Sequence, residues 1–166
     1  MLIGQGGFAL RDYRAGDAPA VTALWRASLE HGVGIVDHHS LAEQQAALEQ
    51  QVVPAQRVRV VTAAGGEIVA FVAATTESVG QLYVRVDHLR RGIGSALLRL
   101  VQDESGGSLW LYTFARNPNA RRFYERHGFV EVERESENMW KLEAIKYLWT
   151  RAPPHVSDAR PRTGSA

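Results

Sequence analysis

Polar and apolar residues follow two different periods along the chain, and each period predicts one kind of secondary structure. Alternating or continuously apolar runs predict about seven strands, at residues 8–13, 57–63, 67–77, 79–86, 108–114, 129–133 and 144–150. Apolar residues at helical spacing predict about four helices, at residues 14–30, 40–52, 92–105 and 117–128. The order of these elements predicts an α/β (α+β) fold, in which helices flank a mostly antiparallel sheet.

Local signals support two of the predicted boundaries. Ser40 and Glu43 stand three residues apart, which is the spacing of a capping box, so the second helix is expected to begin there. Gly65 and Gly66 separate two β-branched runs and predict a hairpin between them.

The composition is that of a globular protein. The chain has 166 residues, of which 45% are hydrophobic and 22% charged, enough for one buried core and too few for two ordinary domains. We therefore expect one domain at residues 1–151, followed by a disordered tail at 152–166 that is nearly free of large apolar residues. The sequence contains no cysteine, which excludes disulfides, thiolate metal sites and a cysteine nucleophile.

Charge and apolar content also limit the location and the partners. The net charge of +1 argues against nucleic acid as a partner. The opening segment MLIGQGGFALRDY has no basic stretch and no long apolar run, so we expect neither a signal peptide nor a membrane span. The absence of cysteine fits a reducing compartment, so we expect a cytoplasmic protein. His38 and His39 are adjacent, so their side chains point in different directions, and His31 is the nearest further histidine. These three residues do not have the spacing of a metal site, so none is predicted.

A pair of glycines stands where a strand gives way to a helix. In HLRRGIGSALLRL, Gly92 and Gly94 open the third predicted helix, and Arg90 and Arg91 precede them. The first N–H groups of a helix have no partner inside it, so this end can hold a phosphate or pyrophosphate. A tight turn without a ligand is the alternative. A dinucleotide fingerprint would need a third glycine where Leu97 stands, and a Walker-type loop would need a lysine after the second glycine.

Two sequence blocks occur in order along the chain. The first is LYV followed by DHLRRGIGSALL, and the second is the pattern N-x-x-A-x-x-F-Y-E-R-x-G-F at residues 117–129. Together they resemble the GCN5-related N-acetyltransferase (GNAT) superfamily. The likeness covers roughly residues 8–149. It implies the GNAT fold, with a twisted sheet whose fourth strand is bulged and splayed, and acetyl-CoA as the cosubstrate.

The resemblance also implies which residues hold the coenzyme. Backbone N–H groups of one loop would bind its pyrophosphate, namely those of Arg90, Arg91, Gly92, Ile93, Gly94 and Ser95. The splayed strand would pair its backbone with the pantetheine arm at Leu82, Val84 and Val86. Asn117 matches the asparagine that bonds the pantetheine region, although it also suits a helix N-cap. Leu89 stands where the family usually has glutamine or arginine, which puts one side-chain contact in doubt.

The implied chemistry is direct attack of a primary amine on the thioester within a ternary complex. Tyr124 occupies the position of the family's proton donor to the departing thiolate; a purely structural aromatic is the alternative. A backbone N–H near Tyr83 or Val84 would bind the thioester carbonyl oxygen. The general base stays open between Glu77, acting through water, Glu30 or His31, and a water chain to bulk solvent.

The acceptor is expected to be a small-molecule amine or a protein or peptide amine. The alternative from a different class is a degenerate acyl-CoA-binding sensor or regulatory module without turnover, supported by Leu89 and by the lack of a clear base. A toxin-like activity on charged transfer RNA is disfavoured by the near-neutral net charge and by the acidic stretch EVERESE. Many relatives form homodimers through their last strands, and the sequence leaves open whether this chain does so.

Overall fold

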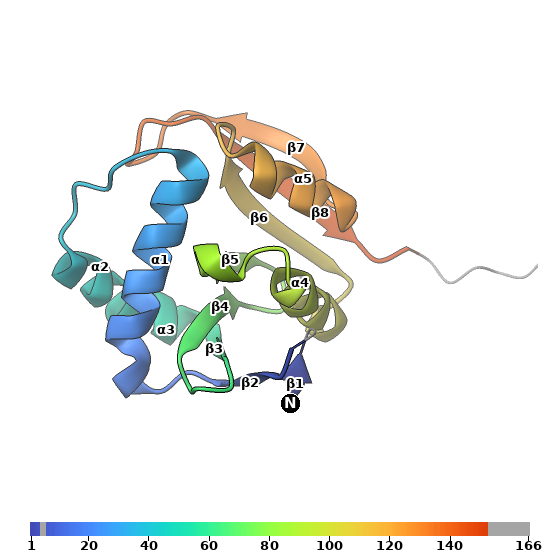
Figure 1. Cartoon of the computed structure of the whole chain (residues 1–166). Coiled ribbons are helices and arrows are strands. Elements are labelled where there is room, and N and C mark those ends of the chain that lie inside the picture. Colours follow the sequence, from blue (N-terminus) through green and yellow to red (C-terminus); the bar gives the residue numbers. More distant parts are fainter. Residues whose placement is uncertain (4–5, 153–166) are drawn as a thin grey trace, which may run out of the picture.

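Two antiparallel sheets form the framework of the computed structural model, which describes residues 1–3 and 6–152 (Figure 1). The first sheet has the order β1-β2-β3-β4-β5, with the bounds β1 (Leu2–Ile3), β2 (Phe8–Asp12), β3 (Arg57–Thr62), β4 (Ile68–Ala74) and β5 (Val79–Val84). The second has the order β6-β8-β7, with β6 (Ser108–Phe114), β7 (Val130–Glu135) and β8 (Ala144–Thr150).

The helices lie between these strands in the predicted order. They are α1 (Ala18–Val33), α2 (Leu41–Ala47), α3 (Val53–Ala55), α4 (Ile93–Glu104) and α5 (Pro118–Arg126). Short 3-10 turns lie at Ala15–Asp17 and Val86–His88, and a π-helical turn at Leu48–Val52 joins α2 to α3. Among the described residues, no helix is both long enough and apolar enough to cross a bilayer.

The core has two parts because helices cover both faces of the first sheet. Phe71 and Ala73 of β4 pack with Val21 of α1 on one face. Val72 of the same strand packs with Leu97 of α4 on the other face. Six consecutive residues of β4 are therefore buried, and the strand shows no alternation of polar and apolar residues.

The sequence signals for helix and hairpin boundaries are confirmed. The Ser40 hydroxyl accepts the N–H of Glu43 at 3.1 Å, and the Glu43 carboxylate accepts the N–H of Ser40 at 2.6 Å, which completes the capping box. In the hairpin between β3 and β4, Gly66 has a φ of 88°, a left-handed conformation that suits glycine.

One strand was not predicted, and several predicted boundaries differ by a few residues. The two-residue strand β1 was not predicted, because so short a run carries no periodicity; it pairs with β2. The strand predicted to reach Val86 ends at Val84, since residues 86–88 turn into a 3-10 helix before the loop to α4. Residues 153–166 of the predicted tail lie outside the described residues.

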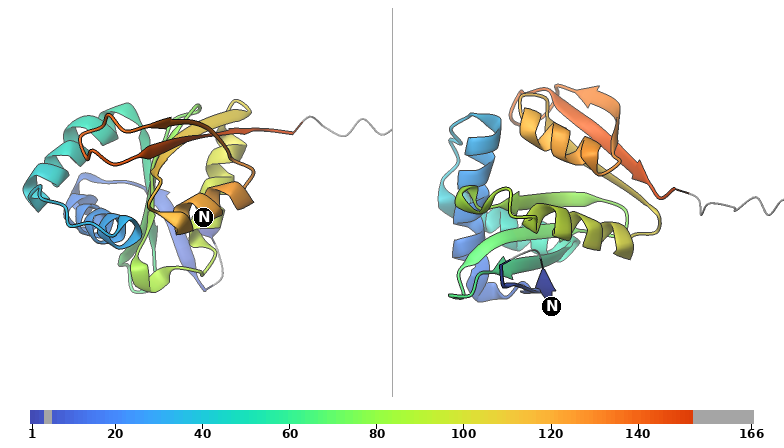
Figure 2. Two further views of the ribbon diagram at one scale, coloured as in Figure 1. Left: turned by 90° about the horizontal axis from the view of Figure 1, so that it is seen from above. Right: turned by 45° about the vertical axis from the view of Figure 1, so that its right-hand side comes forward.

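The two sheets meet at one point and then separate. Ser78 forms an isolated parallel bridge to Trp110, and the Trp110 N–H donates to the Glu77 carbonyl at 3.0 Å. Beyond this bridge β5 and β6 diverge, and the second sheet with α5 rises away from the first (Figure 2). In β5, Gly80 is an extra residue between the pairs Ala74–Val79 and Ala73–Gln81, so the splayed strand carries the predicted bulge.

Candidate active site

The splay leaves backbone groups of β5 without a strand partner. The Arg85 N–H donates to the Val69 carbonyl of β4 at 2.8 Å, which fixes the alternation along the strand. Tyr83 therefore directs its N–H and C=O toward β4, whereas Leu82 and Val84 direct theirs toward the open edge. The Ser28 hydroxyl of α1 donates to the Val84 carbonyl at 3.0 Å, as expected for a carbonyl on that edge.

The facing edge of β6 is open in the same way. The Ala115 N–H donates to the Glu143 carbonyl beside β8 at 2.9 Å, so Tyr112 and Phe114 direct their N–H and C=O groups toward β5. The Phe114 carbonyl accepts the N–H of Asn117 at 3.0 Å. An extended ligand inserted between β5 and β6 would thus find hydrogen-bonding groups on both sides.

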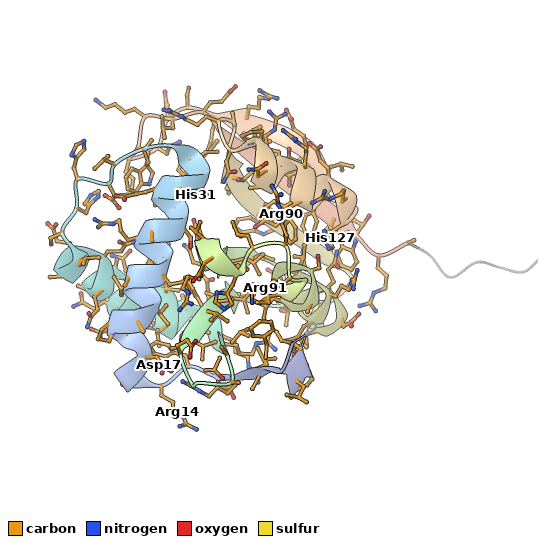
Figure 3. All side chains as sticks on the ribbon, viewed as in Figure 1. Arg14, Asp17, His31, Arg90, Arg91 and His127 are labelled. Carbon is orange, nitrogen blue, oxygen red and sulfur yellow. The ribbon has the colours of Figure 1, made fainter. Side chains whose placement is uncertain are left out.

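A cavity of about 730 Å³ occupies the opening between the strands. Its walls come from the last turns of α1, from β5 and β6, from the start of α4, from α5 and from the β7–β8 loop. Three arginines line it, Arg90, Arg122 and Arg126. In Figure 3, Arg90 lies between α4 and α5, and His31 lies near the C-terminal end of α1.

The loop before α4 presents a row of free N–H groups. Arg90 and Gly92 both adopt left-handed conformations, with φ of 61° and 78°, which curl the loop into the start of the helix. The first helical bond runs from the Ala96 N–H to the Gly92 carbonyl at 3.0 Å. Within the part of the chain that the structure describes, no N–H of residues 90–95 donates a hydrogen bond. Such a row can hold an anionic group.

This segment also lies inside a sequence match to a known family. The family model described as an acetyltransferase (GNAT) domain matches residues 54–131, from the end of α3 into β7. The chain belongs to the GNAT acetyltransferase superfamily. No curated protein matches the chain.

Solved structures share the fold of this GNAT protein at low sequence identity. A GCN5-related N-acetyltransferase from Rhodopseudomonas palustris aligns with a TM-score of 0.71 at 20% identity, covering 90% of this chain and 99% of that one. YjaB from Escherichia coli in its apo form aligns with a TM-score of 0.72 at 17% identity, covering 87% and 99%. A chimera of the spermidine N-acetyltransferase SpeG from Vibrio cholerae and hSSAT aligns with a TM-score of 0.67 at 19% identity, covering 86% and 95%.

Tyr124 of the GNAT domain lies in the cavity wall, where most of its ring is buried. It is 8% exposed and packs edge-to-face on Phe123 and Phe129, with ring centroids 5.2 and 5.7 Å away. No described residue forms a hydrogen bond with its hydroxyl, whereas the hydroxyl of Tyr147 donates to Glu125 at 2.9 Å. Burial, with a smaller contribution from Tyr83, raises the pKa of Tyr124 well above its usual value, so the hydroxyl stays protonated.

Asn117 caps the start of α5 and also lines the cavity. Its side-chain oxygen accepts the N–H of Ala120 at 3.1 Å, which is the predicted N-cap. Gly32 of α1 lies against the Asn117 amide. Asn117 therefore lies where the two halves of the GNAT domain come together beside the cavity.

The cavity gathers most of the residues predicted for coenzyme binding. These are Leu82, Val84, Val86, Arg90, Gly92, Ile93, Gly94, Ser95 and Asn117. Val86 lines it from the 3-10 turn after β5, so it does not continue the strand edge as predicted. Arg91 is exposed and lies outside the cavity lining.

The candidates for the base are dispersed. Glu77 is exposed in the turn before β5, at the joined end of the two sheets, and does not line the cavity. The Glu30 carboxylate accepts the N–H of Asp37 at 2.8 Å. His31 does line the cavity, on the last turn of α1. The geometry thus does not support Glu77 as the group that takes the proton.

The loop between α1 and α2 is held by a buried carboxylate. Asp37, 7% exposed, pairs with Arg26 at 3.4 Å and with Nδ1 of His39 at 2.8 Å. Burial pushes the pKa of Asp37 upward, but hydrogen bonds from His39 and the charge of Arg26 outweigh it and lower that pKa below its usual value. The His39 ring packs edge-to-face on Trp140 of the β7–β8 loop at 5.4 Å. This contact brings the loop to the cavity wall, although neither His38 nor His39 lines the cavity.

Several cavity residues were not predicted from the sequence. Ser28 stands on the apolar stripe of α1, and a polar residue there is the signal that could have identified it. Glu135 and Trp140 come from β7 and the loop after it, where no motif marks them. No group of three or more His, Cys, Asp or Glu side chains suited to a metal occurs among residues 1–3 and 6–152.

Proposed function

We propose that this GNAT domain transfers an acetyl group from acetyl-CoA to a primary amine, by direct attack within a ternary complex. The observation that carries the proposal is the cavity between β5 and β6, which has free backbone groups on both edges and free N–H groups at residues 90–95. A thioester on an extended polar arm with a pyrophosphate at its far end fits this arrangement in its chemistry.

The coenzyme side of the cavity is cationic, which suits a phosphate-bearing ligand. Arg90 and Arg122 line it, and guanidinium groups can form two parallel bonds to one phosphate. Leu82 and Val84 offer the backbone pairing for the pantetheine arm. Because Tyr83 uses its N–H toward β4, the N–H of Val84 is the better donor to the thioester carbonyl oxygen.

The reaction needs two proton movements and no covalent enzyme intermediate. The amine nitrogen forms a bond to the thioester carbonyl carbon, and the C–S bond breaks with its electron pair left on sulfur. Tyr124 donates the proton or hydrogen bond that stabilises the departing thiolate. The proton lost from nitrogen passes to water at the cavity wall lined by His31. A proton from solvent restores Tyr124 after it has protonated the thiolate, so the products are one amide and one thiol.

The test combines binding with turnover. Calorimetry with acetyl-CoA should give saturable binding that weakens severalfold in Arg90→Gln. Arg99→Gln is the matched control, since Arg99 is exposed on α4 outside the cavity, and it should bind normally. A screen of primary amines should then release free coenzyme A. Binding without thiol release for any amine would favour the acyl-CoA-binding module instead, and absence of binding would refute both functions.

A further inference from the structure

The charged residues that line the cavity come from different elements of the fold. Three arginines line it, Arg90 in the loop before α4 and Arg122 and Arg126 on α5. Among the described residues that line the cavity, Glu135 is the only acidic one. It is the last residue of β7, so the carboxylate and the arginines come from different elements.

The sheet register locates Glu135 at the open end of the second sheet. Glu135 pairs with Ala144 of β8, and Ala144 pairs with Phe114 of β6. Neighbouring strands lie about 5 Å apart, so the β7 backbone runs about 10 Å from that of β6. Glu135 therefore enters the cavity lining from a strand that is set back from the splayed edge, where the thioester of the proposed reaction would lie.

Aromatic side chains flank this end of the cavity. Trp140 and Tyr112 both line it. Trp140 is held by Asn138, whose side-chain oxygen accepts the Trp140 N–H at 3.1 Å and whose amide donates to the Leu142 carbonyl at 2.6 Å. A carboxylate beside aromatic faces favours a cation over an anion.

The nearby positive groups are engaged elsewhere. Arg134 forms ion pairs with Glu131 and with Glu143 at 3.3 Å. The Lys146 ammonium lies 5.3 and 5.8 Å from the ring centroids of Trp110 and Tyr112. Neither side chain lines the cavity, so neither neutralises Glu135 within it.

We infer that the acceptor is a small diamine, an inference that rests on the proposed acetyl transfer. One nitrogen of the diamine is acetylated, and Glu135 binds the second nitrogen, as a cation, beside Trp140. Glu135 is then a specificity-determining residue. Acceptors that carry a carboxylate at that position would be repelled.

Three four-carbon amines that differ only in the end group test this inference. They are butane-1,4-diamine, butylamine and 4-aminobutanoate, assayed by coenzyme A release with the product identified by mass spectrometry. We expect kcat/KM for the diamine to exceed that for butylamine by roughly tenfold, with 4-aminobutanoate the poorest substrate. In Glu135→Gln the value for the diamine should fall to that of butylamine through KM, and butylamine should be unaffected.

Glu137→Gln is the matched control, because Glu137 is exposed two residues further on and does not line the cavity. It should leave all three substrates unchanged. Equal values for the three amines, or a preference for 4-aminobutanoate, would overturn the inference and leave acetyl transfer standing. The same loss in Glu137→Gln as in Glu135→Gln would also overturn it. If acetyl-CoA binds and no amine is acetylated, the proposed function fails and the inference fails with it.

Discussion

Gly32 in α1 lies so close to the side-chain amide of Asn117 that a Cβ at residue 32 would lie 2.7 Å from Nδ2 of Asn117. The two residues are far apart in the sequence and belong to opposite sides of the cavity. A second contact supports the same junction, since the Arg116 guanidinium donates to the Gly34 carbonyl at 3.3 Å. The end of α1 and the start of α5 therefore fix each other's position beside the proposed coenzyme site.

Gly32→Ala should separate stability from binding. Alanine favours a helix over glycine by about 1 kcal/mol, which offsets the cost of displacing the Asn117 cap, also about 1 kcal/mol. We expect the free energy of unfolding in urea to change by less than about 1 kcal/mol. The Kd for acetyl-CoA should rise, because Asn117 is pushed from its position in the cavity wall.

A double-mutant cycle provides the control for this prediction. Asn117→Ala should weaken binding by itself, and adding Gly32→Ala should then change little, since the atom it displaces is gone. Additive effects of the two substitutions on Kd would contradict a direct contact between these residues.

Gly92 and Gly94 should respond differently to alanine. Gly92 has a φ of 78° and no neighbouring atom within 4 Å, so its requirement is conformational, and Gly92→Ala should cost about 1–2 kcal/mol of stability. At Gly94 a Cβ would meet Phe123 and Val84 at 3.5 and 3.6 Å, which is ordinary contact. Gly94→Ala should keep its stability in urea unfolding and lose acetyl-CoA affinity, because both neighbours line the cavity. Equal destabilisation by the two substitutions would argue against this distinction.

These glycines also show which parts of the site can be predicted from sequence. The positions of Gly92 and Gly94 after a strand and before an apolar stripe predicted a helix start at this loop, but left an anion site and a tight turn as alternatives. The family resemblance was needed to assign residues 90–95 to the coenzyme. The bulged strand followed from the family resemblance, and the sheet register agrees with it. The cap at Asn117 was the alternative to its family role, and the hydrogen bond from the Ala120 N–H agrees with it.

Long-range contacts could not be predicted in this way. The bond from Ser28 to the Val84 carbonyl joins residues 56 positions apart, and nothing in the apolar stripe of α1 specifies its partner. Glu135 belongs to a strand in which every residue is exposed, so its sequence resembles any solvated edge strand. The position of Glu77 outside the cavity lining is likewise a long-range property, because it is set by where the two sheets join.

Tyr124→Phe should reduce turnover and spare binding. If the hydroxyl serves the departing thiolate, kcat should fall by roughly 100-fold while the Kd for acetyl-CoA stays the same, as measured by stopped-flow thiol release and calorimetry. Tyr147→Phe is the matched control: it removes a buried hydroxyl that bonds Glu125, so it should cost about 1 kcal/mol of stability and leave kcat unchanged. Full activity in Tyr124→Phe would remove this residue from its proposed role.

The buried carboxylate of Asp37 should make part of the free energy of unfolding depend on pH in the acid range. The pKa of Asp37 is lower in the folded chain than its usual value of 3.8, so its contribution is present above that pH and is lost as the pH falls through the folded pKa. Thermal unfolding is compared between pH 6 and pH 2.5, about the range in which such a carboxylate titrates. Asp37→Asn should have a lower Tm than the unmodified chain at pH 6, and its Tm should fall less as the pH is lowered. Asp12→Asn, which removes a carboxylate that is 67% exposed in its pair with Arg57, should change the dependence of Tm on acid much less.

Because Asp37 also holds His39 against Trp140, we expect Asp37→Asn to raise the KM for the acceptor amine more than the Kd for acetyl-CoA. An equal effect on both ligands would mean that the α1–α2 loop supports the whole cavity and not its acceptor end alone.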